Sequence, residues 1–337
     1  MAEPQLLPAE DFAAAEPMMK SLIAGGRAAI SSVVKQVGQR FGDPDGVQAT
    51  YAVHGLVHYA CRPGAEAERK MVAQTLAAEL KQNHSADLKS FICQQLQLCG
   101  DDEQVPALAA LLADESLCEP ATQALAAIGT AAAAAALREA LPRAEGRRRV
   151  TIINALGRLG DSQASAEIRK SLGQPDADLQ AVSMYAAGNI GDLEAADRLL
   201  KAAAGEPGYM RNQAIDACLR LARRAAADGK TAQAEQLLRN LSKTPLERHE
   251  RCAVLDTLAQ VLGPKGSADI LQALAASDLR IRVAAGRIAL HWTRSQAKSA
   301  PAETAKVLKR LLQATQEKAV LYAAENLLKT IEPQPGT

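Results

Sequence analysis

Apolar residues recur along this chain in short blocks with helical spacing, and several of these blocks end in a glycine. Four blocks, LQLCG, LAAIG, LGRLG and AGNIG, close at Gly100, Gly129, Gly160 and Gly191. These glycines lie 29, 31 and 31 residues apart, a further 31 residues lead to LRLA at Ala222, and AQVLG closes at Gly263 after 41 more. Self-similarity at a fixed period is the signature of a repeat architecture. The sequence therefore predicts tandem helical repeats with a period of about 31 residues.

Two columns of the aligned repeats explain why each repeat should form the same helix. Four residues separate the columns, so both lie on one face of a helix. Small side chains in the first column allow a neighbouring helix to approach, and large side chains in the second column fill the space beside them. The first column holds Ala124, Ala155, Ala186 and Ala217, and the second holds Ile128, Leu159, Ile190, Leu221 and Leu262.

The joints between the helices carry residues that end and begin helices. The closing glycine suits the left-handed backbone conformation that terminates a helix. Asp161 and Asp192 stand where the next helix needs an N-cap. In the repeat that ends at Gly160, residues 131–141 are predicted to form the first helix and residues 147–159 the second.

A helix pair this short cannot bury its apolar face alone, so successive pairs must stack. The longer spacing before Gly263 predicts a lengthened hairpin around residues 223–231. We therefore predict an all-α fold, a right-handed α-solenoid of stacked antiparallel helix pairs.

The repeats resemble the HEAT family, and more closely its short bacterial form, the phycobilin-lyase-type HEAT-like repeat. The residues that carry the resemblance are NALGRLGD at 154–161 and YAAGNIGD at 185–192, and the clear repeats cover about 90–263. Other helical-hairpin repeats are the alternative. The family consists mostly of scaffolds and adaptors, and the resemblance implies that the second helices line a concave surface.

The regions on either side of the regular repeats differ from them. Residues 1–10 are expected to be a flexible N-terminus. Residues 11–85 are predicted to form a helical cap or divergent repeats, with four helices broken at 25–26, 42–46 and 62–64. Regular repeats follow over 86–263. Divergent repeats and a cap, including helices at 302–313 and 317–331, are expected over 264–331, before a disordered tail at 332–337.

Composition supports helices and gives no global sign of a charged partner. Hydrophobic residues make up 48% of the chain but aromatic residues only 3%, so the apolar content is mostly Ala and Leu, which favour helices. The formal charge is +1, and no apolar run reaches the roughly 20 residues of a membrane helix. From the polar start of the chain we expect no signal peptide. Six scattered cysteines without a CxxC pair suggest reduced core residues and a cytoplasmic protein, although an exported form with a removed signal stays open.

The repeat alignment predicts which side chains of the second helices face a partner. The column six residues before each closing position holds Gln123, Asn154, Tyr185, Asp216 and Thr257, and the column two before it holds Arg158, Asn189 and Arg220. Arg, Tyr and Asn side chains suit protein interfaces. The alternative is a merely solvated helix face. The predicted partner-binding ridge consists of Arg147, Thr151, Asn154, Arg158, Tyr185, Asn189, Arg211, Asn212, Asp216 and Arg220.

Metal and cofactor chemistry has weak support. His54, His58 and Cys61 share one helix face and are valid zinc ligands, but no fourth ligand is evident and histidines packed between repeats are the simpler interpretation. The single pair His249-Glu250 does not match HEAT-like iron hydroxylases, which need several such pairs, and no residue marks a bilin site. We predict no cofactor.

Nucleic acid is not favoured as a partner. Arg280, Arg282, Arg287, His291, Trp292 and Arg294 form a local cationic-aromatic cluster. Its simpler interpretation is a helix whose tryptophan packs in the core. The sequence therefore predicts a non-catalytic scaffold or adaptor that binds a protein or peptide. An enzyme or enzyme subunit, lyase-like or metal-dependent, and a nucleic-acid-binding protein are the alternatives, and the oligomeric state stays open.

Overall fold

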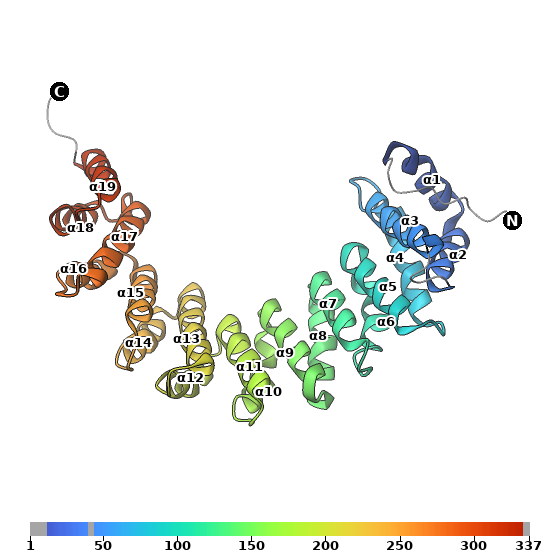
Figure 1. The fold of residues 1–337 in the computed structure, drawn as a ribbon, viewed down its shortest axis with the longest axis horizontal. Coiled ribbons are helices and arrows are strands. Elements are labelled where there is room, and N and C mark those ends of the chain that lie inside the picture. The colour runs from blue at the N-terminus through green and yellow to red at the C-terminus, as the bar shows by residue number, and fades with distance from the viewer. Residues whose placement is uncertain (1–11, 40–43, 333–337) are drawn as a thin grey trace. The chain divides into compact units, whose positions relative to one another are not determined.

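The computed structural model describes residues 12–39 and 44–332, and every regular element in these ranges is a helix, which confirms the all-α prediction (Figure 1). The chain divides into two compact units, the first ending at Ile168 and the second beginning at Arg169. The predicted flexible start at 1–10 and the predicted tail at 332–337 lie outside the described ranges, apart from Glu332. Within the described ranges, no helix combines the length and apolar content needed to cross a membrane.

Each compact unit is a series of stacked helix pairs. In compact unit 1 the helices are α1 (Phe12–Ala24), α2 (Gly26–Gln39), α3 (Pro44–Ala60), α4 (Glu66–Leu80), α5 (Ala86–Cys99), α6 (Val105–Ala109), α7 (Cys118–Ile128), α8 (Ala131–Ala140) and α9 (Gly146–Leu159). The boundary falls inside α10 (Ser165–Ser171). Compact unit 2 continues with α11 (Ala177–Ile190), α12 (Ala196–Ala203), α13 (Tyr209–Ala227), α14 (Thr231–Leu241), α15 (Arg248–Leu262), α16 (Ser267–Leu274), α17 (Leu279–Gln296), α18 (Pro301–Ala314) and α19 (Lys318–Ile331).

The predicted helix pairs are present with nearly the expected bounds. α8 and α9 are the helices predicted at 131–141 and 147–159, and α18 and α19 are those predicted at 302–313 and 317–331. Helices α1 to α4 are the four predicted between 11 and 82, although part of the predicted break at 42–46 lies outside the described ranges. The predicted lengthened hairpin near 223–231 is mainly a longer helix, because α13 continues five residues past Ala222. We call α5, α7, α9, α11, α13, α15, α17 and α19 the second helices, and α4, α6, α8, α10, α12, α14, α16 and α18 the first helices.

Small residues let neighbouring second helices approach closely. Ala124, Ala155, Ala186 and Ala217, the first column of the alignment, are all buried. The contact between α11 and α13 is the tightest example: a Cβ added at Gly188 would lie 2.9 Å from the carbonyl oxygen of Ala217. Because packed interiors leave no room for such an atom, the two helices can meet only with a glycine here.

The closing glycines behave as predicted at three positions, whereas Gly263 and Gly100 differ. Gly263 ends α15 with φ of 52° and ψ of −125°, outside the left-handed helical conformation, so the prediction is wrong there. Gly129, Gly160 and Gly191 adopt φ of 68°, 66° and 83°, the left-handed conformation that ends a helix. Gly100 has an extended backbone, with φ of −68° and ψ of 157°, so the left-handed prediction is wrong there. A Cβ at Gly100 would lie 2.6 Å from the carbonyl oxygen of Leu96, so this glycine serves a close approach of the chain to itself.

The two predicted N-cap aspartates also differ. Asp161 caps the turn before α10, because its side chain accepts a hydrogen bond from the backbone nitrogen of Gln163 at 3.2 Å. Asp192 makes no capping bond, so that prediction is wrong. Its Oδ1 atom instead accepts a hydrogen bond from Arg169 at 2.6 Å.

That contact belongs to a series of arginine–aspartate pairs between successive first helices. Arg138 of α8 pairs with Asp161 at 2.5 Å, Arg169 of α10 with Asp192, and Arg239 of α14 with Asp269 of α16 at 2.9 Å. Each pair ties a first helix to the start of the next first helix. The stack is therefore held by apolar contacts between second helices and by ion pairs between first helices.

Replacing Ala186 with leucine should destabilise compact unit 2 by roughly 1 to 3 kcal/mol, because this side chain of α11 is completely buried and its packed surroundings leave no room for the added atoms. The measurement is the free energy of unfolding in urea, with Val182→Leu, a change at a half-buried position of the same helix, as the control. If Ala186→Leu unfolds at the wild-type urea concentration, the assigned register of α11 is wrong.

Candidate partner-binding surface

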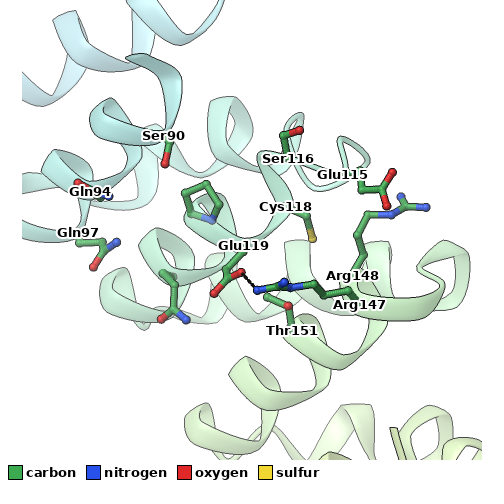
Figure 2. Close-up of a pocket in the computed structure, with 12 residues that line it drawn as sticks. Ser90, Gln94, Gln97, Glu115, Ser116, Cys118, Glu119, Arg147, Arg148 and Thr151 are labelled. Carbon is green, nitrogen blue, oxygen red and sulfur yellow. Dashed lines mark hydrogen bonds and ion pairs between the residues drawn. The ribbon is translucent and has the colours of Figure 1, made fainter. Parts of the chain in front are cut away.

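A polar hollow of about 610 Å³ lies across three consecutive second helices of compact unit 1 (Figure 2). Residues four apart share a helix face, and three such pairs meet here, one from each helix. The lining includes Ser90, Gln94 and Gln97 from α5, Glu119 and Gln123 from α7, and Arg147, Arg148 and Thr151 from α9. The repeat thus places the same face of each second helix around one surface depression.

Several side chains of the hollow keep free hydrogen-bonding capacity. Ser90, Gln94 and Gln97 make no side-chain hydrogen bond to the described part of the chain. Arg147 pairs with Glu119 at 2.9 Å, but the two side chains are 83% and 52% exposed. Exposed pairs of this kind contribute little to stability, so Arg147 can exchange Glu119 for a ligand carboxylate. Arg148 donates to the carbonyl oxygen of Ala113 at 3.0 Å.

The one thiol of the hollow is not set up as a nucleophile. Burial raises the pKa of Cys118, and its Sγ atom lies 3.9 Å from the hydroxyl of Thr122. The thiolate is the reactive form of cysteine, so a raised pKa keeps Cys118 in the unreactive form. The hollow can therefore bind a ligand through hydrogen bonds from its amides and hydroxyls and through ion pairs with its arginines.

The α9 part of the predicted ridge lies at this hollow. Arg147 and Thr151 line it, and Asn154 follows one turn later, partly exposed. Arg158 is exposed and donates to Gln123 at 3.2 Å. The α5 residues of the hollow, Gln94 and Gln97, were missed as ridge members. Gln94 stands six residues before Gly100, as Gln123 stands six residues before Gly129. Extending the alignment to the repeat that ends at Gly100 would therefore have identified Gln94.

In compact unit 2, Tyr185 of α11 and Arg220 of α13 come together. The Arg220 guanidinium lies 5.1 Å from the centre of the Tyr185 ring and pairs with Asp216 at 2.8 Å. Asn189 is partly exposed on α11, and Asn212 is exposed on α13. Tyr185, Asp216 and Arg220 thus form a partly exposed cation–aromatic cluster that bridges two second helices.

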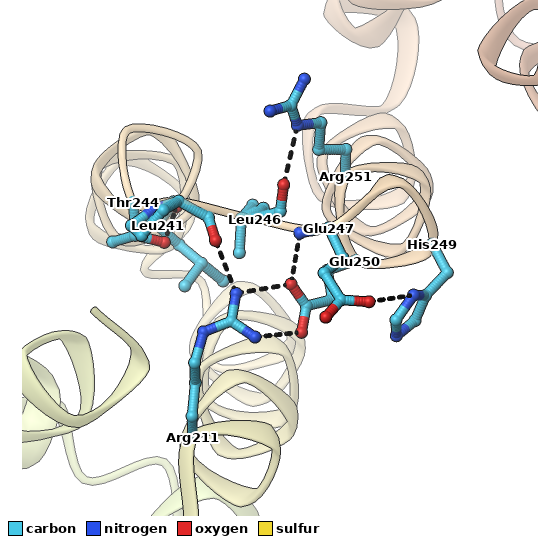
Figure 3. A network of polar contacts seen from close by, with 9 residues as sticks. Arg211, Leu241, Thr244, Leu246, Glu247, His249, Glu250 and Arg251 are labelled. Carbon is cyan, nitrogen blue, oxygen red and sulfur yellow. Dashed lines mark hydrogen bonds and ion pairs between the residues drawn. The ribbon is translucent and has the colours of Figure 1, made fainter. Parts of the chain in front are cut away.

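Arg211 is the one residue of the predicted ridge that does not reach the surface. Its side chain is 3% exposed and forms two hydrogen bonds of 2.7 Å with Glu250 of α15 (Figure 3). It also donates to the carbonyl oxygen of Pro245 at 2.7 Å, while Glu250 accepts from the backbone nitrogen of Glu247 at 2.6 Å. The prediction for Arg211 is wrong because the first turn of α13 packs against α15. Arg211 joins these helices and is not available to a partner.

The buried pair has a pH dependence with a defined sign. Burial alone would raise the pKa of Glu250, but the hydrogen bonds from Arg211 and from the Glu247 backbone outweigh it and hold that pKa below its usual value. A carboxyl group with a lowered pKa in the folded state stabilises the fold at pH values above its unfolded pKa. That contribution is lost as the pH falls through the lowered pKa of the folded protein.

Arg211→Ala should lower the free energy of unfolding by about 3 to 5 kcal/mol, because Glu250 is left charged and buried without its partner. The double variant Arg211→Met, Glu250→Met should lose much less, because it buries no charge. Thermal or urea unfolding of both variants at pH 7 gives the comparison. Equal losses in the two variants would show that the unpaired charge is not the cause.

A second residue departs from the predicted columns. Thr257 is 1% exposed and accepts a hydrogen bond from Arg223 at 3.2 Å, so it does not face a partner. On the same helix, Cys252 and Asp256 are partly exposed and Gln260 is exposed.

The histidine cluster of α3 supports packing between repeats. His54 Nδ1 lies 2.9 Å from the side-chain oxygen of Gln95 on α5, and His54 Nε2 lies 3.1 Å from His58 Nε2. The Cys61 thiol lies 3.6 Å from the carbonyl oxygen of Leu98. Among the described residues, no three His, Cys, Asp or Glu side chains come together so that they could hold a metal ion.

Trp292 is 2% exposed and donates its indole N–H to the carbonyl oxygen of Gly263 at 3.0 Å, as expected for a core tryptophan. Of the cysteines, Cys93, Cys99, Cys118 and Cys218 are buried as predicted, whereas Cys252 is only partly buried. Cys61 is exposed, so its assignment to the core is wrong.

These features define an all-α helical-repeat protein built from stacked helix pairs. No protein-family model matches the sequence, and no curated protein matches it either. Several solved structures are similar, but only distantly. One is importin beta, with 14% identity, a TM-score of 0.45, and coverage of 95% of this chain and 54% of that one.

Two further similar structures are an engineered protein and the complex of CpcE and CpcF of phycocyanin lyase from Nostoc sp. PCC7120. The engineered protein has 16% identity, a TM-score of 0.41, and coverage of 94% of this chain and 91% of that one. The lyase complex has 20% identity, a TM-score of 0.33, and coverage of 77% and 94%. At TM-scores below 0.5, these similarities support no inference about what this chain does, and the fold assignment rests on its own helices.

Proposed function

We propose that this chain is a non-catalytic scaffold or adaptor that binds a protein or peptide on the exposed face of its second helices. The observation that carries the proposal is the hollow across α5, α7 and α9. Amide side chains both donate and accept hydrogen bonds, so the free amides of Gln94 and Gln97 match the alternating groups of an extended peptide backbone. Arg147 and Arg148 stand beside them, and guanidinium groups bind carboxylates with two parallel hydrogen bonds.

The remaining parts of the proposal follow from the same features. The resemblance to the short bacterial HEAT-like repeat is consistent with a bacterial scaffold. Cysteines that are mostly buried as free thiols suit a cytoplasmic setting. No cofactor is part of the proposed role.

The test is capture of partners from native lysate by the wild-type chain and by Gln94→Glu, Arg147→Glu, followed by mass spectrometry. The double change adds negative charge to the hollow and should abolish capture of a specific partner, because both the amide and the guanidinium contacts are lost. The measurement is the ratio of each captured protein between the two baits.

The matched control is Gln82→Glu, Arg143→Glu, which changes the charge equally at exposed positions outside the hollow. It should capture the same partner as the wild type. A partner that binds the hollow variant and the wild type equally would place the binding surface elsewhere.

A further inference from the structure

Positive charge gathers at the C-terminal end of compact unit 2. From Leu279 to Ile331 the sequence contains ten Lys and Arg residues but three Asp and Glu residues, a formal charge of +7. The whole chain carries +1, so all other residues together carry −6. Charge concentrated in this way attracts oppositely charged partners and speeds their association.

Helix α17 presents much of this charge on one exposed face. Arg280, Arg287, His291 and Arg294 are all exposed, and their spacing of seven, four and three residues keeps them on one side of the helix. Arg280 and Arg294 make no ion pair within the described part of the chain. Arg287 reaches Glu317 at 3.3 Å while 68% exposed, a contact that contributes little to the fold.

Apolar side chains are exposed among these cations. Leu279 is 62% exposed and Val283 is 44% exposed, both in the first turns of α17. Beside them, an open hollow of about 640 Å³ lies between α15 and α17, lined by Glu247, Arg248, His249, Cys252, Arg280 and Ala284. Apolar residues grouped with arginines at the surface mark an interaction site more strongly than scattered ones.

The carboxylates near this hollow are already engaged by helix ends. Asp278 accepts hydrogen bonds from the backbone nitrogens of Arg280 and Ile281, and it also pairs with Arg248 at 3.1 Å. Glu247 caps the first turn of α15. A carboxylate at a helix N-terminus compensates the positive end of the helix dipole, so these two groups leave the guanidinium of Arg280 without a partner.

We propose that the hollow between α15 and α17, together with the cationic face of α17, binds an acidic segment of a partner protein that carries apolar side chains among its carboxylates. The carboxylates pair with Arg280, Arg287 and Arg294, and the apolar side chains cover Leu279 and Val283. A nucleic-acid strand would leave these two side chains uncovered, and the buried Trp292 is not available for base stacking. The inference rests on the proposed protein-binding function and names the partner chemistry for compact unit 2.

The test uses the full chain as bait for a yeast-displayed library of random 15-residue peptides, followed by fluorescence anisotropy of the enriched peptides. The wild type should enrich peptides that combine Asp or Glu with Leu, Ile, Val or Phe, and raised salt should weaken their binding. Arg280→Glu with Arg287→Glu should weaken binding by about tenfold or more, because attraction becomes repulsion. Val283→Ser, which leaves the charge unchanged, should also weaken it.

The matched control is Lys298→Glu with Lys306→Glu, which makes the same change in charge at exposed positions that form no ion pair in the described part of the chain. It should retain most of the affinity.

Four results would overturn the proposal: no enrichment of acidic peptides, equal binding by the Arg280/Arg287 variant, an equal loss in the control, or retained affinity in Val283→Ser. Binding of a dT20 oligonucleotide that depends on Arg280 and Arg287, without peptide binding, would replace it with a nucleic-acid site. If no acidic peptide binds, but the Gln94→Glu, Arg147→Glu variant still loses its captured partner, this inference is wrong and the proposed function stands.

Discussion

The structure depends on one constraint: a pair of short helices has no core of its own until another pair stacks on it. Helices such as α8 and α9, of 10 and 14 residues, are each too short to be stable alone. Close approach between neighbours is therefore the main requirement on the sequence. It explains why alanine fills the first column of the repeats and why glycine stands at 188, where a Cβ would meet the backbone of Ala217. The same constraint leaves the outer face of each second helix free to vary.

Within compact unit 2, the second helices are held together by two kinds of interaction. Between α11 and α13 small residues such as Gly188 and Ala217 allow a close apolar contact. Between α13 and α15 a buried ion pair, Arg211 with Glu250, adds a polar connection. A buried pair contributes little net stability compared with an apolar contact, but losing one partner costs much more. The α13–α15 contact is therefore the one at which a single polar substitution does most damage.

The sequence predicted the fold better than the site. Helix positions, the small-residue columns and three left-handed glycines follow from local spacing, and a period near 31 residues makes that spacing visible. Arg211 and Thr257 were misplaced because burial depends on how far one helix is shifted along its neighbour. Asp192 was misassigned as a cap because the approach of Arg169 is set by stacking, which no local pattern encodes.

The central claim is that partners bind the exposed face of the second helices. Hydrogen–deuterium exchange of the purified chain, alone and in complex with a captured partner, tests this claim most directly. The account predicts added protection in second helices, such as α5, α7 and α9, with little change in the first helices α4, α6 and α8. Protection confined to the first helices would contradict it.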